Sequence, residues 1–405
     1  DGRLVLMLAT NDEQEPRFLI NTSAQTQLIF GLNVENWAVT SEVIIDKNAL
    51  GYPLKNLSSV PPGTYYAQAL LNRYKDYNLS NGITVSLPPD QGEGQRWNRK
   101  PGNLYSTPVK IEIKENAENN FLIVLDKVIP KIQTPIDSKY IKHISMRSEL
   151  LSEFWGEDVM LGAHVLLPEG FDKNPDAHYP LMIFHGHFPD DFGGFRTTPP
   201  DPTLEPSYSA RFDLEGYNIT EQQEAHDLYQ AWSGEGFPRF IAIEIQHPTP
   251  YYDDSYAVNS ASQGPYGDAL TYELIPYIEE QFRGIGEGWS RFTYGGSTGG
   301  WEAMAVQTFY PDEYNGAFIA CPDPIDFRAY LTVNIYEDSN GYFYDSQFQN
   351  LPRPGHRDYL GNVQASQYDF NRLEAVLGDK GRSGQQYDIW EATFSPMGDD
   401  GYPLR

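Results

Sequence analysis

The chain has 405 residues, of which 40% are hydrophobic and 14% aromatic, so it can form a large buried core. Its formal charge is −27, because 29 Lys and Arg face 56 Asp and Glu. Nucleic acids and anionic membranes bind basic surfaces, and this composition argues against both as partners. Apolar runs such as "YPLMIF" are too short to cross a bilayer, so no membrane insertion is expected.

The single cysteine, Cys321, rules out an intramolecular disulfide, which fits a cytosolic protein or a bacterial exported one. The sequence begins at Asp1 rather than at methionine. Removal of an export signal would explain this start, and so would trimming of the chain. A composition rich in Tyr, Asn, Gly and Pro and poor in Lys favours export. We therefore expect a periplasmic or extracellular protein, with a cytoplasmic location as the alternative.

Residues 1–130 are predicted to form an all-β domain. Short runs rich in β-forming residues, such as "RLVLMLA", "TQLIFGLNV", "SEVIID" and "FLIVLDKVIP", are separated by Pro, Gly, Asn and Asp. None of these runs has a helical period. Their number and spacing predict an immunoglobulin-like sandwich of about seven strands. A linker is expected at residues 131–140.

Residues 141–405 show a different pattern. "KHISMRSELL" and "EDVMLGAHVLLP" predict a hairpin, and "YPLMIFHG" and "RFIAIEIQHP" read as buried strands. A helical segment containing Pro276 follows, and then a strand, a helix and a strand between residues 291 and 323. This alternation predicts an α/β domain with a mostly parallel sheet and helices on both faces. Residues 188–236 are polar and proline-rich and are predicted to be a long loop or lid, and residues 326–405 to be irregular apart from a short helix in "DFNRLEAVLG".

Ser297 lies in the pattern G-x-S-x-G, formed by residues 295–299. Small residues two positions either side of a serine allow a strand and a helix to approach closely around a strained turn. Such a turn exposes the hydroxyl and directs the amide of Thr298 towards it. A glycine-rich turn used only for packing is the alternative. The predicted strand before Ser297 and helix after it favour a nucleophile.

A second backbone donor is expected from the loop His185-Gly186-His187-Phe188, which follows a buried strand. Gly186 allows close approach, and the amide of His187 or Phe188 is the candidate oxyanion donor. The two histidine side chains are expected to fix this loop by hydrogen bonds. The H-x-H pair also suggests a metal site, but the sequence shows no third ligand. We therefore expect neither a metal nor an organic cofactor.

Residues 140 to 330 resemble the esterase D and enterochelin esterase group of α/β-hydrolases. The resemblance is carried by "YPLMIFHGHFP", "DALTYELIPYIEEQFR", "RFTYGGSTGGWEAMAVQTFYPDEYNGAF" and "ACPDP". It implies a carboxylic ester hydrolase with a serine, acid and histidine triad, preceded by a β-sandwich. The expected substrate is a small or polymer-linked ester, cleaved through an acyl-enzyme on Ser297.

The acid and the histidine follow the serine in the chain order of this fold. The resemblance implies that the acid follows one of the last two sheet strands and the histidine follows the other. Neither of these two strands is evident in the sequence, so the hydrolase domain is predicted to be incomplete at its C-terminus. Three interpretations stay open. The natural chain continues past Arg405 and supplies both groups; the triad is rewired to Asp323 and His356; or catalysis is lost and the chain is an exported binding or scaffold protein.

Further substrate contacts are expected where strands end, because ligands of open α/β sheets bind at the carboxyl ends of the strands. The loop at residues 248–269 follows a buried strand and is the main candidate, although it also reads as a solvated loop. The predicted binding residues are His185, Gly186, Phe188, Tyr251, Tyr252, Asp253, Asp254 and Glu302.

Overall fold

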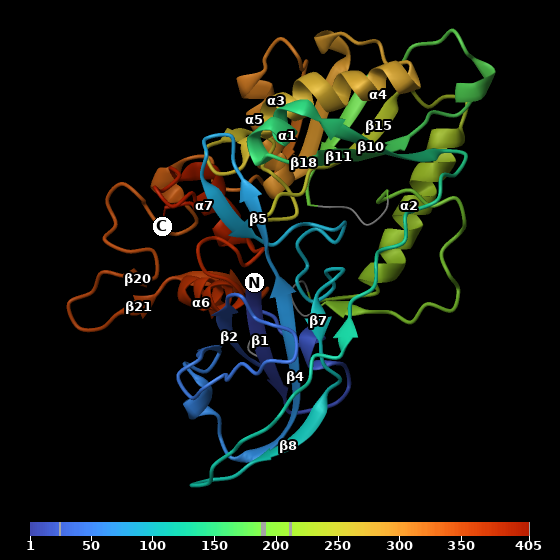
Figure 1. Ribbon diagram of the computed structural model, residues 1–405. Coiled ribbons are helices and arrows are strands. Elements are labelled where there is room, and N and C mark those ends of the chain that lie inside the picture. The colour runs from blue at the N-terminus through green and yellow to red at the C-terminus, as the bar shows by residue number, and fades with distance from the viewer. Residues whose placement is uncertain (24–25, 188–191, 210–212, 405) are drawn as a thin grey trace.

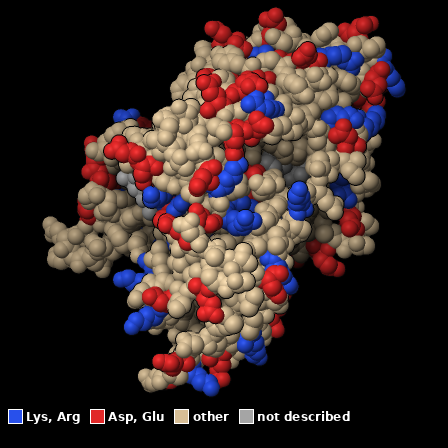
Figure 2. Space-filling model, viewed as in Figure 1, with Lys and Arg blue, Asp and Glu red and all other residues tan. Residues whose placement is uncertain are grey.

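The computed structural model describes residues 1–23, 26–187, 192–209 and 213–404. Figure 1 shows an antiparallel sheet built from the N-terminal residues at the bottom and an α/β sheet with its helices at the top. The C-terminal segment, in red, lies beside both. None of the described helices combines the length and the apolar composition needed to span a membrane. In Figure 2, basic and acidic side chains are intermixed on the visible face.

The N-terminal sheet is antiparallel, in the order β3-β2-β1-β4-β7-β9, with β8 also paired to β4. Central strand β1 is buried along most of its length, which explains its unbroken apolar sequence. The strands are β1 (Gly2–Ala9), β2 (Leu28–Val34), β3 (Leu50–Tyr52), β4 (Gly63–Arg73), β7 (Leu104–Tyr105), β8 (Val109–Ile113) and β9 (Lys127–Val128).

The two faces of this sheet are not covered as an immunoglobulin-like sandwich predicts. Helix α6 (Gln367–Leu377) packs on one face through Leu373, Val376 and Leu377. On the other face, Trp37, Val43 and Leu125 contribute from irregular segments. Within the described residues, "SEVIID" and most of "FLIVLDKVIP" have no strand partner. Val43, Ile45 and Leu125 of these runs therefore cover the sheet, whereas Ile44, Leu122 and Val124 are exposed.

The boundary predicted at residue 130 does not separate two independent cores. The hairpin of β5 (Lys75–Asn78) and β6 (Thr84–Leu87) inserts its apolar side chains into the core of the α/β region. The rings of Tyr77 and Trp155 lie 5.2 Å apart there in an edge-to-face arrangement. The hairpin thus joins the N-terminal residues to the α/β core.

The α/β sheet has the order β10-β11-β15-β12-β18-β19. β10, β11 and β15 pair antiparallel, and β15, β12, β18 and β19 pair parallel, which confirms the predicted α/β class. The strands are β10 (Ile141–Ser148), β11 (Val159–Leu166), β15 (Ile241–Gln246), β12 (Leu181–His185), β18 (Arg291–Gly296) and β19 (Ala317–Ala320), with α1 (Glu149–Trp155) between β10 and β11.

Helices cover both faces of this sheet. One face packs against α3 (Tyr266–Ala269), α4 (Ile275–Phe282) and α5 (Thr298–Phe309). A π-helical turn at Leu270–Leu274 joins α3 to α4 just before Pro276, which cannot donate the normal helical hydrogen bond. The opposite face packs against α2 (Tyr217–Ser233) through Trp232. The region predicted as a long loop at 188–236 therefore contains a helix of 17 residues.

The C-terminal region is more ordered than the sequence pattern predicts. It contains α6 and α7 (Gln386–Phe394), and two hairpins. Helix α6 packs on the N-terminal sheet, whereas Ile389 and Trp390 of α7 enter the α/β core. The two hairpins are β20 (Phe343–Tyr344) with β21 (Leu351–Pro352), and β22 (Pro354–Arg357) with β23 (Val363–Ser366).

Two further short hairpins lie outside the C-terminal region. They are β13 (Tyr208–Ser209) with β14 (Leu214–Glu215), and β16 (Asn259–Ser260) with β17 (Gly264–Pro265).

Strand β19 forms one edge of the α/β sheet. In the described part of the chain it pairs with β18 alone, and Phe318 and Ile319 are exposed on it. Apolar residues are unusual on an open edge, because unpaired strands invite association. The two further strands that the family resemblance implies are not found among the described residues.

Replacement of Leu377 by alanine tests whether α6 is part of the N-terminal core. This side chain is 4% exposed and packs with Val5 and Met7 of β1. Its truncation should lower the free energy of unfolding by about 2–4 kcal/mol in urea denaturation. Leu360→Ala is the control, because Leu360 is 69% exposed. Equal stability of the two variants would show that α6 does not stabilise the sheet.

Candidate functional site

Ser297 lies on the turn between β18 and α5 with backbone angles φ 57° and ψ −121°. A residue other than glycine rarely adopts a positive φ, and such strain is typical of functional turns. Gly295 and Gly299 make the turn sterically feasible. A Cβ atom on Gly299 would lie 1.9 Å from the carbonyl oxygen of His185, and one on Gly295 would lie 2.6 Å from the same atom. The predicted strand–serine–helix turn is therefore present, and the Ser297 side chain is exposed on it.

The backbone of the turn is fixed by the chain that follows β19. The amide of Ser297 donates to the carbonyl of Ala320 at 3.0 Å, and the amide of Asp323 donates to the carbonyl of Ser297 at 3.2 Å. These bonds hold Asp323 beside the serine. The strain at Ser297 is thus sustained by hydrogen bonds on both sides of the residue.

The carboxylate of Asp323 accepts the hydroxyl hydrogen of Ser297. Ser297 Oγ lies 3.2 Å from Asp323 Oδ1. Oδ2 accepts from Thr298 Oγ1 at 3.0 Å, from the Tyr256 hydroxyl at 2.7 Å and from Gln386 Nε2 at 3.3 Å. Burial, followed by the Asp323 charge, raises the pKa of Tyr256 far above its usual value, so this hydroxyl stays a donor. Asp323 therefore contacts the serine directly, without a histidine between them.

His356, predicted as the base of a rewired triad, lies elsewhere. It belongs to the hairpin of β22 and β23, where its ring centroid is 6.5 Å from that of Phe370. Phe370 lies next to Tyr387, and Tyr387 next to Trp390, whose indole donates to the Tyr256 hydroxyl. This row of rings separates His356 from Asp323. The structure thus brings Asp323 to Ser297 and leaves His356 apart from both.

Two residues of the site carried no sequence signal. Gln386 and Trp390 come from α7 and reach the serine turn from the C-terminal segment. Gln386 also accepts a hydrogen bond from the Tyr252 hydroxyl at 3.0 Å. Tyr256 belongs to the loop at 248–269, and the position of this loop after a strand could have identified it as a site residue.

The start of α5 places the Thr298 amide, one of the two predicted oxyanion donors, beside Ser297. The first amides of a helix have no acceptor within the helix, and Thr298 is the first residue of α5. The backbone of His185 and Gly186 lies against Gly299, which places the loop after β12 beside this helix start. The second donor, the His187 amide, stays a prediction. Phe188 lies outside the described residues.

A histidine and three carboxylates form a second cluster at the ends of β12 and β15. His187 Nδ1 lies 3.2 Å from Asp253 Oδ1 and 3.2 Å from Asp254 Oδ2. Burial alone would lower the pKa of His187, but its hydrogen bonds to Asp253 and Asp254 raise it to about 11. Burial raises the pKa of Glu302 to about 8, and burial and the nearby Glu302 raise the pKa of Asp254 well above its usual range.

Several residues predicted to contact substrate are buried instead. Glu302 is 0% exposed, and His185, whose Nδ1 lies 3.5 Å from Glu302 Oε2, is 1% exposed. Burial lowers the pKa of His185 to about 3, so its ring is neutral. Tyr251 is 0% exposed and belongs to the α/β core. These three side chains support the site from beneath rather than face a ligand.

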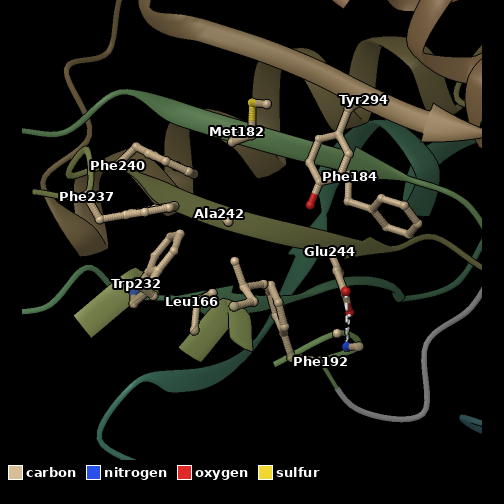
Figure 3. Close-up of a pocket in the computed structure, with 13 residues that line it drawn as sticks. Leu166, Met182, Phe184, Phe192, Trp232, Phe237, Phe240, Ala242, Glu244 and Tyr294 are labelled. Atoms are coloured by element: carbon tan, nitrogen blue, oxygen red, sulfur yellow. Dashed lines mark hydrogen bonds between the residues drawn. The ribbon is translucent and has the colours of Figure 1, made fainter. Parts of the chain in front are cut away.

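A cavity of about 520 Å³ lies between the α/β sheet and α2. Figure 3 shows the residues that line it, among them Met182, Phe184 and Tyr294 of the sheet and Trp232 of the helix. Glu244 is the one carboxylate among the described residues that line it, and it accepts a hydrogen bond from the amide of Gly193. Ser297 does not line this cavity, so we do not assign it to the serine site.

No protein-family model and no curated protein matches the sequence. Among solved structures, a ferulic acid esterase is 19% identical, with a TM-score of 0.31, over 44% of this chain and 58% of that one. A ferulic acid esterase from Anaeromyces mucronatus is 15% identical, with a TM-score of 0.26, over 47% and 63%. An S-formylglutathione hydrolase from Agrobacterium tumefaciens is 13% identical, with a TM-score of 0.30, over 47% and 60%. The chain therefore spans less than two thirds of each of these proteins.

The two glycines that flank the turn allow a matched test of its geometry. Gly299→Ala places a Cβ atom against the His185 carbonyl, whereas a Cβ atom on Gly296 has its nearest neighbour, Ala320 O, at 3.8 Å. Gly299→Ala should lower the free energy of unfolding by about 2 kcal/mol or more, because backbone must move to make room. Gly296→Ala should leave stability nearly unchanged. Thermal unfolding measures both, and similar losses in the two variants would contradict the close approach.

Proposed function

We propose that this chain is a serine hydrolase that cleaves carboxylic esters, with Ser297 as the nucleophile. One observation carries the proposal: an exposed serine on a strained strand-to-helix turn, whose hydroxyl donates to a fixed carboxylate. A serine with no chemical role gains nothing from a positive φ at the start of a helix. The esterases named above resemble the chain too weakly to add to this argument.

In the proposed first step, Ser297 Oγ attacks the ester carbonyl carbon while its proton passes to Asp323 Oδ1. The oxyanion that forms is stabilised by the Thr298 amide and, we propose, by the His187 amide. Collapse of this intermediate breaks the bond to the alcohol, which takes the proton from Asp323. The product is an acyl-enzyme on Ser297.

In the second step, water attacks the acyl-enzyme and gives its proton to Asp323. The bond between the acyl group and Ser297 Oγ then breaks, the serine regains a proton and the carboxylic acid leaves. A carboxylate is a weaker base than imidazole at neutral pH, so this dyad should act more slowly than a histidine-based triad. Gln386 and Tyr256 would keep Asp323 in place during both steps.

The serine assignment can be tested by labelling the protein with a fluorophosphonate probe. We expect modification at Ser297, and loss of both labelling and p-nitrophenyl acetate hydrolysis in Ser297→Ala, by about 10³-fold or more. Ser346→Ala is the control, because Ser346 is exposed and far from the turn in sequence. A correctly folded protein that is not labelled at Ser297 would refute the assignment.

The role of Asp323 can be separated from that of His356. Asp323→Asn keeps the shape of the side chain but removes the proton acceptor, and should slow hydrolysis by about 10²–10⁴-fold. His356→Ala should retain the activity of the unmodified protein, since aromatic rings separate it from the serine. Loss of activity in both Asp323→Asn and His356→Ala would establish the rewired triad in place of the dyad.

A second candidate function is ligand binding without catalysis. It is favoured by the four donors on Asp323, because a buried or half-buried carboxylate with this many hydrogen-bond partners is also typical of a purely structural role. In that case the serine turn would be part of a binding surface of an exported scaffold protein. The same labelling experiment decides between the two functions, since a binding protein leaves Ser297 unmodified.

A further inference from the structure

Three side chains converge on one point at the carboxyl ends of β12 and β15. The ligand atoms of His187, Asp253 and Asp254 all lie within 4.8 Å of one another. His187 Nδ1 carries one proton, yet it faces a carboxylate oxygen at 3.2 Å on each of the two aspartates. A single N–H donor cannot align with both oxygens, so this geometry suits a larger cation better than a proton.

A fourth group points to the same place. Glu302 is 0% exposed and lies against Asp254, with whose carboxyl group it shares a hydrogen bond. Asp254 is also fully buried, and its Oδ2 accepts no hydrogen bond from the described part of the chain. Buried carboxylates normally have donors or a counter-ion, because an unpaired buried charge is very costly. The unsatisfied Asp254 Oδ2, which lies 3.2 Å from His187 Nδ1, is a separate sign that positive charge is needed here.

The carboxylates of the cluster have few cationic side chains beside them. Asp254 and Glu302 are fully buried and the Asp253 side chain is 16% exposed. Among the described residues, the ion-pair contacts of these carboxylates are formed with His187 and His185 alone, and none is formed with Lys or Arg. A divalent cation between His187 and the two aspartates would supply the positive charge that no Lys or Arg provides there.

We propose that His187, Asp253 and Asp254 form a binding site for a divalent transition-metal cation such as Zn²⁺ or Mn²⁺, with Glu302 behind Asp254. One imidazole nitrogen and two carboxylate oxygens are a common donor set for these ions, whereas Ca²⁺ and Mg²⁺ prefer oxygen ligands alone. The cation would take the position of the proton on Nδ1. The His187 side chain is 48% exposed, which leaves an entry path and a coordination position for water.

This site goes beyond the proposed hydrolase and does not depend on it. The cation would join the loop after β12 to the loop after β15, and Glu302 lies one helical turn beyond the serine turn on α5. Binding should therefore stabilise the fold around Ser297 whether or not the serine reacts. Ser297→Ala should bind the cation as tightly as the unmodified protein, so failure of one proposal is distinguishable from failure of the other.

The test is calorimetric titration of tag-free full-length protein, stripped with EDTA, with ZnCl₂, MnCl₂, CaCl₂ and MgCl₂. We expect one equivalent of Zn²⁺ or Mn²⁺ to bind, more tightly than Ca²⁺ or Mg²⁺, with a rise in the melting temperature. Co²⁺ should give visible absorption bands that are absent when His187 is replaced by alanine. Absence of saturable binding of Zn²⁺ and Mn²⁺ at millimolar concentration would overturn the proposal.

Two pairs of variants separate metal binding from folding. Asp254→Asn and His187→Ala should weaken binding by about 100-fold or more. The controls are Asp399→Asn and His178→Ala, which alter exposed residues of the same types. Without metal, Asp254→Asn should melt close to the temperature of the unmodified protein, because asparagine keeps the shape of the side chain and an acceptor for the Tyr256 amide. Unchanged affinity in both Asp254→Asn and His187→Ala would overturn the site.

Discussion

The close contact between the start of α5 and the end of β12 is the constraint on which the rest of the site depends. No side chain fits between Gly299 and the His185 carbonyl, so the helix begins directly on the loop that follows the strand. The same contact accompanies the strained backbone at Ser297 and places the start of α5 beside the loop after β12. It also brings Glu302 beneath the loop that carries His187. One steric requirement thus positions both the serine and the acidic cluster.

The C-terminal segment completes this arrangement from a distance in sequence. α6 covers a face of the N-terminal sheet, and α7 carries Gln386 and Trp390 to the serine turn. Arg3 on β1 donates to the carbonyls of Ala375 and Val376 at the end of α6, so the first strand fixes the helix that precedes α7. The N-terminal sheet therefore influences the position of Asp323 through these two helices, although it contributes no residue to the site.

The sequence predicts what depends on local pattern. Apolar runs and the glycines around Ser297 predict the parallel strands, α5 and the strained turn, because these follow from periodicity and from backbone sterics. The resemblance to a family suggested a histidine, and His356 was the one available downstream, yet a hairpin and Phe370 hold it elsewhere. The contact of His187 with Asp253 and Asp254 was not predicted either. Asp253 and Asp254 are more than sixty residues from His187, and only the order of β12 and β15 in the sheet brings them together.

The carboxylate of Asp323 and the carboxylates of Asp254 and Glu302 are stabilised in the protein in different ways. Asp323 is surrounded by neutral donors, two hydroxyls, an amide and the serine itself, so its charge is dispersed without a cation. Asp254 accepts from one neutral donor, the Tyr256 amide, and Asp254 and Glu302 otherwise face each other and the rings of His187 and His185. Buried carboxylates that face each other need positive charge between them, whereas a carboxylate surrounded by neutral donors does not. This difference supports the two proposals, in which Asp323 takes the serine proton and the His187 cluster binds a cation.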